Sequence, residues 1–172
     1  MATLLETLVE KTAALRAPFP GDAPSGEDVS FDPEFEAVKG EIDKLSSLTG
    51  GEVAWRKVVP ECERLLKTRS KDLRLMVWMT VGHGELSGWA GRAEGLVVLR
   101  DLCQSNWDTM YPPVKRLAGR ANLITWMLEQ LDAKAQNAGI VADSAEAVRT
   151  VEGLVRELDA SLGAKLGDKV TF

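Results

Sequence analysis

The 172-residue sequence has little of what catalytic and metal-binding sites are usually made from. It contains one histidine, one tyrosine and two cysteines, Cys62 and Cys103. No CxxC motif exists, so the spacing typical of zinc and redox sites is missing. Both cysteines fall inside helical apolar patterns, and we expect them to be small buried side chains in a reducing compartment.

The sequence also lacks an excess of positive charge and any long apolar run. Its 21 basic and 26 acidic residues give a net charge of −5. This balance argues against a nucleic-acid partner, because phosphates require a clustered basic face. Glu6, Glu10 and Lys11 interrupt the first apolar stretch, which excludes a signal peptide. No run is long enough to insert into a membrane, so we expect a cytoplasmic protein.

Alternation of period two is absent as well, whereas apolar residues recur throughout at helical spacing. The sequence therefore predicts an all-α fold, an array of about seven amphipathic helices around a central helical hairpin. Asp32 before Pro33 and Asp143 before Glu146 are typical helix starts. Glycines at 139 and 163 are expected to end helices. The expected helices cover 3–16, 33–45, 53–68, 70–87, 89–105, 117–137 and 143–163.

The central hairpin is expected in residues 70–113. Ser70 is the predicted N-cap of its first helix, Asp72 sits in the first turn, and Gly88 is the predicted stop. The second helix should run from about Trp89 to Ser105, before prolines that cannot continue it. One stripe should be buried between the two helices and their neighbours, namely Leu73, Val77, Leu96, Leu99 and Trp107.

The usual catalytic patterns fail on spacing. His83 has no HxxxE or HExxH partner, so it cannot build a metal site by itself. The glycines from Gly82 to Gly95 match no nucleotide-binding loop and are better explained by helix ends and close helix crossing. We expect no catalytic residue, cofactor or metal. A small enzyme using His83 with Glu85 remains the alternative from a different class.

Several short motifs follow one another in a characteristic order. An opening motif around Gly26, Asp28 and Asp32 precedes a tryptophan, a Ser-Lys-Asp-Leu-Arg run, a Gly-Leu pair, and a second tryptophan before proline. This order over residues 24–131 resembles the N-terminal domain of the TssA (ImpA) proteins of the bacterial type VI secretion system. The residues that carry the resemblance are Gly26, Asp28, Asp32, Trp55, Ser70, Asp72, Leu73 and Trp107.

The resemblance implies a protein-interaction domain rather than an enzyme. It suggests partners among the baseplate, tube or sheath components, a role in assembling, priming or capping the contractile tail, and self-association as a further option. Residues 1–137 would form the ImpA-type domain, and 138–172 an additional helix and the start of a linker to a further C-terminal part. A related sheath-terminating protein with the same N-terminal domain, or an unrelated helical adaptor, stays open.

The predicted contact residues lie off the core stripes. Trp89 falls at the hairpin turn, and Lys115, Arg116 and Arg120 follow the double proline. An aromatic anchor flanked by charges is a common layout for a protein interface. A solvated helix start is the default explanation of the three basic residues, because charge runs usually face water, and a docking patch for an acidic partner is the functional alternative.

Overall fold

The computed structural model describes residues 1–138 and 144–172, and this part of the chain is all-α, as predicted. No strand occurs in it, and the only extended pairings there are two isolated bridges. Short 3-10 turns extend or precede three of the helices, η1 (Lys44–Ser46), η2 (Val114–Arg116) and η4 (Gly167–Lys169). The helices are α1 (Leu4–Lys11), α2 (Ala13–Arg16), α3 (Pro33–Asp43), α4 (Trp55–Thr68), α5 (Leu73–Ser105), α6 (Leu117–Ala138) and α7 (Ala145–Leu166).

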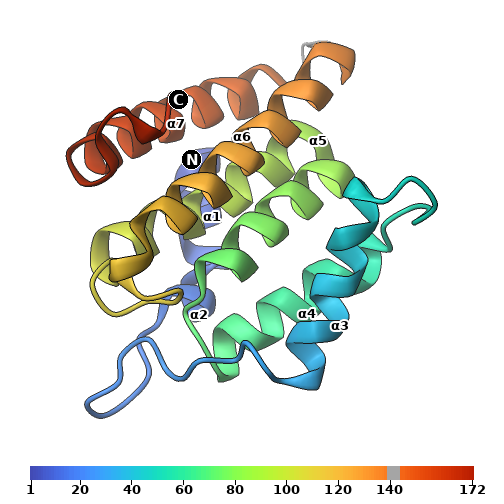
Figure 1. The fold of residues 1–172 in the computed structure, drawn as a ribbon. Helices are drawn as coiled ribbons and strands as arrows, with labels where there is room; N and C mark the ends of the chain where they lie inside the picture. The colour runs from blue at the N-terminus through green and yellow to red at the C-terminus, as the bar shows by residue number, and fades with distance from the viewer. Residues whose placement is uncertain (139–143) are drawn as a thin grey trace.

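The predicted central hairpin is α5, whose two halves are separated by a sharp turn (Figure 1). Ser87 and Gly88 leave helical geometry there, and Gly88 adopts a φ of +56°. The halves approach so closely that a Cβ on Gly95 would lie 2.5 Å from Thr80 Cα. Gly91 likewise abuts the backbone carbonyl of His83. The glycine-rich run therefore serves helix crossing, as the sequence indicated.

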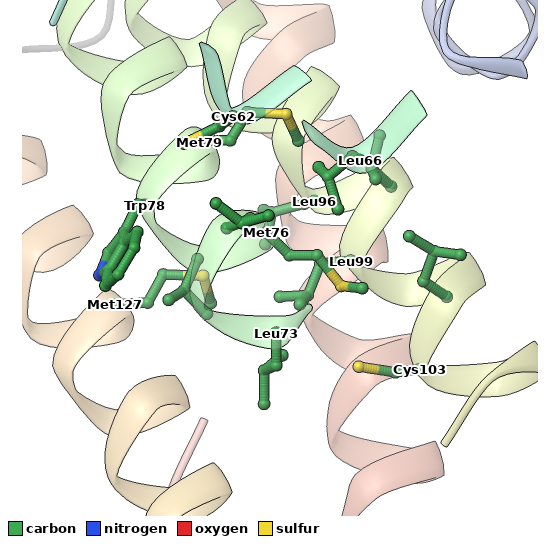
Figure 2. Close-up of a cluster of buried hydrophobic side chains, with 14 of the residues drawn as sticks. Cys62, Leu66, Leu73, Met76, Trp78, Met79, Leu96, Leu99, Cys103 and Met127 are labelled. Atoms are coloured by element: carbon green, nitrogen blue, oxygen red, sulfur yellow. The ribbon is translucent and has the colours of Figure 1, made fainter. Parts of the chain in front are cut away.

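In the described part of the chain, five helices pack directly on this hairpin, namely α1, α2, α4, α6 and α7, whereas α3 packs against α4. The predicted stripe is buried, with Leu73, Val77, Leu96 and Leu99 fully inaccessible. Figure 2 shows this core, in which side chains from both halves of α5 meet Cys62 and Leu66 of α4 and Met127 of α6. Both cysteines are buried and free, as expected.

Some helix boundaries differ from the prediction. The first helix is divided at Thr12, whose buried hydroxyl bonds to the Leu8 carbonyl. Gly163 does not end α7, because burial of the leucines on either side holds that glycine in the helix. The helix ends instead at Leu166, and the following residue, Gly167, has a φ of +57°. Gly139 and Asp143 lie outside the described residues.

Truncating the centre of the core should be costly. We expect Leu99→Ala to lower the free energy of unfolding by roughly 2–5 kcal/mol, because it leaves a cavity in a packed interior. Leu86→Ala is the matched control, since Leu86 is 40% exposed in the hairpin turn. Urea denaturation of both variants measures the difference. A loss below about 1 kcal/mol for Leu99→Ala would mean that the hairpin packs differently.

Candidate functional site

Most of the motif residues meet where three loops lie side by side at the open end of the hairpin. Trp55 is the exception, because its ring packs against Gly82, farther along α5. Two isolated bridges join the three loops, Gly26 with Ser70 and Asp72 with Tyr111. The Leu73 amide also donates to the Tyr111 carbonyl at 2.7 Å. These contacts connect segments far apart in sequence, so we refer to them together as the loop junction, comprising residues 25–32, 69–72 and 106–113.

Gly26 is required by the geometry of the loop junction. Its φ is +74°, and a Cβ at this position would lie 2.1 Å from the Arg69 carbonyl oxygen and 2.9 Å from the Phe19 ring. The next amide, of Glu27, donates to the same Arg69 carbonyl at 3.1 Å. Only a residue without a side chain permits this approach, so the motif glycine has a structural role.

The acidic motif residues bind arginines within the chain. Asp72 caps α5 by accepting from the Arg74 amide at 2.8 Å, and it pairs with the Arg74 guanidinium at 2.6 Å. That guanidinium also reaches Ser30 Oγ at 2.9 Å and Asp28 at 3.7 Å. A hydrogen bond from Ser30, aided by the Arg74 charge, lowers the pKa of Asp28. Asp32 precedes α3, but its carboxylate pairs with Arg69 at 2.6 Å.

The predicted N-cap at Ser70 is wrong, because α5 begins three residues later, at Leu73. Ser70 pairs with Gly26 in an extended conformation, and the following amide, of Lys71, donates to the Ser25 carbonyl at 2.8 Å. This pairing delays the helix, so Asp72 takes the capping position. The Ser70 hydroxyl is buried without a hydrogen-bond partner among the described residues.

Lys71 is a buried cation inside the loop junction. Its ammonium donates to the carbonyls of Leu15 at 2.8 Å and Leu66 at 2.7 Å, and lies 4.5 Å from the centre of the Phe19 ring. No part of the residue is exposed. Burial lowers the pKa of Lys71 to about 8. The side chain thus ties α2 and α4 to the start of α5.

Arg120 is not a surface residue, which corrects the predicted basic patch. It is fully buried, and its guanidinium donates to three carbonyls of the loop after α5, those of Trp107, Met110 and Pro112, at 2.6–2.8 Å. It also stacks on the Trp107 ring at 4.6 Å. Loop carbonyls that no helix or sheet satisfies need donors, and Arg120 supplies them from α6.

The remaining predicted contact residues do not share one surface. Lys115 and Arg116 are exposed on η2, beside the loop junction. Trp89 is half-buried just after the hairpin turn, at the end of the hairpin opposite to the loop junction. The second half of α5 separates the two places by roughly 24 Å at 1.5 Å per residue. We therefore distinguish the η2 patch (Lys115, Arg116) from the surroundings of Trp89.

Trp89 borders a hollow of about 440 Å³ between α5, α6 and α7. The guanidinium of Arg92 lies over the Trp89 indole, 4.4 Å from the ring centre, and Arg92 is only 3% exposed. Sequence reasoning missed Arg92. The available signal was its position three residues after Trp89, which places both on one helix face. The other walls of this Trp89 groove are mostly apolar, and include Leu96, Leu128, Leu131, Val151, Val155 and Phe172.

His83 faces carboxylates other than the one the enzyme alternative assumed. Its Nε2 lies 3.0 Å from Glu63 and 4.0 Å from Glu94, and the hydrogen bond lowers the pKa of Glu63. Glu94 is also paired with Lys11 at 2.8 Å. Glu85 instead faces a lysine of α6 at 3.4 Å. The three possible ligand atoms lie within 4.8 Å of one another, and one of the two carboxylates is already paired with Lys11.

These features define a class of protein, an all-α domain whose motif residues hold its own loops together and whose outward features are a basic patch and an apolar groove. Within the described residues, no helix combines the length and apolar character needed to cross a membrane. The model of the family described as ImpA, N-terminal, type VI secretion system matches residues 16–129, more than half of the chain. The chain belongs to this family.

Two relatives agree with the assignment. Type VI secretion system component TssA1 of Pseudomonas aeruginosa is 30% identical over 97 residues, which are 53% of this chain and 28% of that protein. The chain thus spans just over a quarter of its curated relative. The N-terminal domain of TssA from Burkholderia cenocepacia, which includes the ImpA_N region, matches in structure with a TM-score of 0.66 and 24% identity. That match covers 93% of this chain and 85% of the solved one, and it shows the fold.

Replacing the two residues at the start of α5 should separate their roles. We expect Ser70→Ala to change the free energy of unfolding by less than about 0.5 kcal/mol, because its hydroxyl makes no bond there. Asp72→Ala should cost more than about 2 kcal/mol, since it removes a cap and leaves Arg74 without its closest carboxylate. Chemical denaturation checks both. A loss of about 1 kcal/mol for Ser70→Ala would restore the capping role.

The stability of the protein should depend on the charge of Lys71. Because the pKa falls from 10.5 to about 8 on folding, the unfolded state holds more protons between these pH values, and stability contributed by this group rises with pH there. Below pH 8 both states are charged and the contribution is constant.

The comparison is between the wild type and Lys71→Met, with the exposed Lys57→Met as control. Urea denaturation from pH 7 to 10 should show the wild type gaining roughly 1–3 kcal/mol relative to Lys71→Met. Lys57→Met should follow the wild type. Parallel curves for wild type and Lys71→Met would show that the folded protein keeps the ammonium charged.

Proposed function

We propose that this chain is a non-catalytic protein-interaction domain that helps assemble, prime or cap the type VI tail tube and sheath at the baseplate. The observation that carries the proposal is that residues of the family motif contact other parts of the same chain. Gly26, Asp28, Asp32 and Asp72 are occupied by contacts within the chain. Motif residues with such contacts stabilise the domain itself. We therefore expect partner proteins to bind the outward-facing features, the η2 patch and the Trp89 groove.

The relatives support a role in the type VI secretion system, but they do not identify one partner within it. TssA1 is named a component of the type VI secretion system, and this chain corresponds to 28% of its length. Baseplate, tube and sheath proteins, and a second copy of the chain, are therefore the partners to be tested. A role in terminating the sheath, rather than starting it, is the second form of the same proposal, because a sheath-terminating relative would share this domain.

The η2 patch favours an acidic partner. Lys115 and Arg116 project from a 3-10 turn immediately before α6, on a chain with a net charge of −5. A cluster of basic residues on an acidic protein orients an acidic partner surface and increases the rate at which the two proteins associate. Arg120, buried behind the patch, fixes the loop that carries it. The patch is therefore held in a defined place.

Reversing the charge of this patch should weaken binding without unfolding the domain. We expect Lys115→Glu with Arg116→Glu to reduce affinity for the tail component it contacts by about tenfold or more, and to reduce the salt dependence of binding. Biolayer interferometry with purified sheath, tube and baseplate proteins over a range of NaCl concentrations measures both effects. The melting temperature should change little, since both side chains are exposed.

The matched control is Arg56→Glu with Lys57→Glu, which makes the same charge change at another exposed basic pair, at the start of α4. This control should bind as the wild type does. Unchanged affinity of the η2 double variant for every component would remove the patch from the interface. Absence of binding between the wild-type chain and all of these components would overturn the proposed function itself.

A further inference from the structure

The Trp89 groove contains buried hydrogen-bond donors for which the described residues offer no acceptor. Nε and Nη1 of Arg92 are buried and have no acceptor in the part of the chain that the structure describes. The indole Nε1 of Trp89 is in the same situation. A buried guanidinium normally finds a carboxylate or several carbonyls, as Arg120 does in this molecule.

The surroundings hold the Arg92 side chain in this place. Stacking on Trp89 fixes one face of the guanidinium. On the other half of α5, Gly84 leaves room for it, because a Cβ there would lie only 3.0 Å from Arg92 Cγ. Without such constraints, an arginine side chain extends into water, where its donors are hydrated. Two small local features instead keep it against an apolar hollow.

The charges around the groove define what can enter it. Glu85 is the carboxylate whose field reaches Arg92, and it is already paired with Lys134 at 3.4 Å. Glu129 and Asp132 of α6 line the groove and are solvent-exposed. Several carboxylates on one segment would be repelled by this rim. A single carboxylate that reaches Arg92 gains a charge-assisted hydrogen bond in a mostly apolar hollow.

We propose that the Trp89 groove binds a segment of a partner protein that places one carboxylate against Arg92 and Trp89 Nε1, and apolar side chains along α6 and α7. The inference deepens the proposed function, on which it rests, by naming the chemistry of the bound segment. The hollow of about 440 Å³ suits a few side chains rather than a whole domain. The carboxylate can belong to an aspartate, a glutamate or a chain terminus.

The test uses a random peptide library displayed with free C-termini and selected against the full chain. Enriched peptides are then synthesised in three forms, with the acid intact, with Asp or Glu changed to the amide, and with an amidated C-terminus. Binding is measured by fluorescence anisotropy. The indole N–H signal of Trp89 in ¹⁵N NMR spectra reports whether the groove is the site occupied.

The proposal expects enriched peptides that combine one acidic group with apolar residues, shift the Trp89 indole signal, and bind at least about tenfold more weakly when that acid is neutralised. Arg92→Gln should cause a similar loss, whereas Arg56→Gln, which removes an exposed charge on α4, should not. Ala135→Trp, which fills the groove from α6 without altering Arg92, should also prevent binding. It provides the test if Arg92→Gln fails to fold.

Three results would overturn the inference: no enriched peptide, peptides that bind without an acid, or binding unaffected by both groove variants. These results leave the proposed function standing if tail components still bind through the η2 patch. Conversely, acid-dependent peptide binding in the groove together with no binding to any tail component would support the groove and overturn the assignment to tail assembly. The two failures are therefore distinguishable.

Discussion

The fold depends on the close contact between the two halves of α5. At Gly91 and Gly95 the second half has no Cβ, and the first half fills that space with the His83 carbonyl and Thr80. Backbones that approach this closely exclude water and leave a single register for the leucines on either side. All the helices that contact this hairpin inherit its geometry, so the loop junction and the Trp89 groove occupy fixed positions at its two ends.

The loop junction shows what the charged residues of the family motif do in the folded chain. Its buried and half-buried charged groups have partners within the chain: Asp72 pairs with Arg74, Asp32 pairs with Arg69, and the Lys71 ammonium donates to two carbonyls. Irregular loops expose backbone groups that helices would satisfy internally, and here side chains perform that task.

Helical periodicity was enough to predict the fold, because burial of an amphipathic face dominates the choice of structure. Local signals were less informative wherever a distant segment competed. Ser70 is a good cap in isolation, yet pairing with Gly26 shifts the helix start to Asp72. The sequence around Arg120 predicts a solvated side chain, yet this side chain is buried because it donates to carbonyls of the loop after α5. Arg92 was missed, because its spacing from Trp89 is the signal the sequence offers, whereas the groove that it borders is completed by α6 and α7.

The buried guanidinium of Arg92 has a consequence for how this domain can change. A methionine or leucine at that position would remove the desolvation penalty and pack against the same apolar walls. Selection for a more heat-resistant free domain would therefore discard the arginine early, whereas selection for recognition would retain it. Residue 92 is consequently a position where stability and function oppose each other. Its identity in laboratory-evolved lineages would record which of the two pressures had acted.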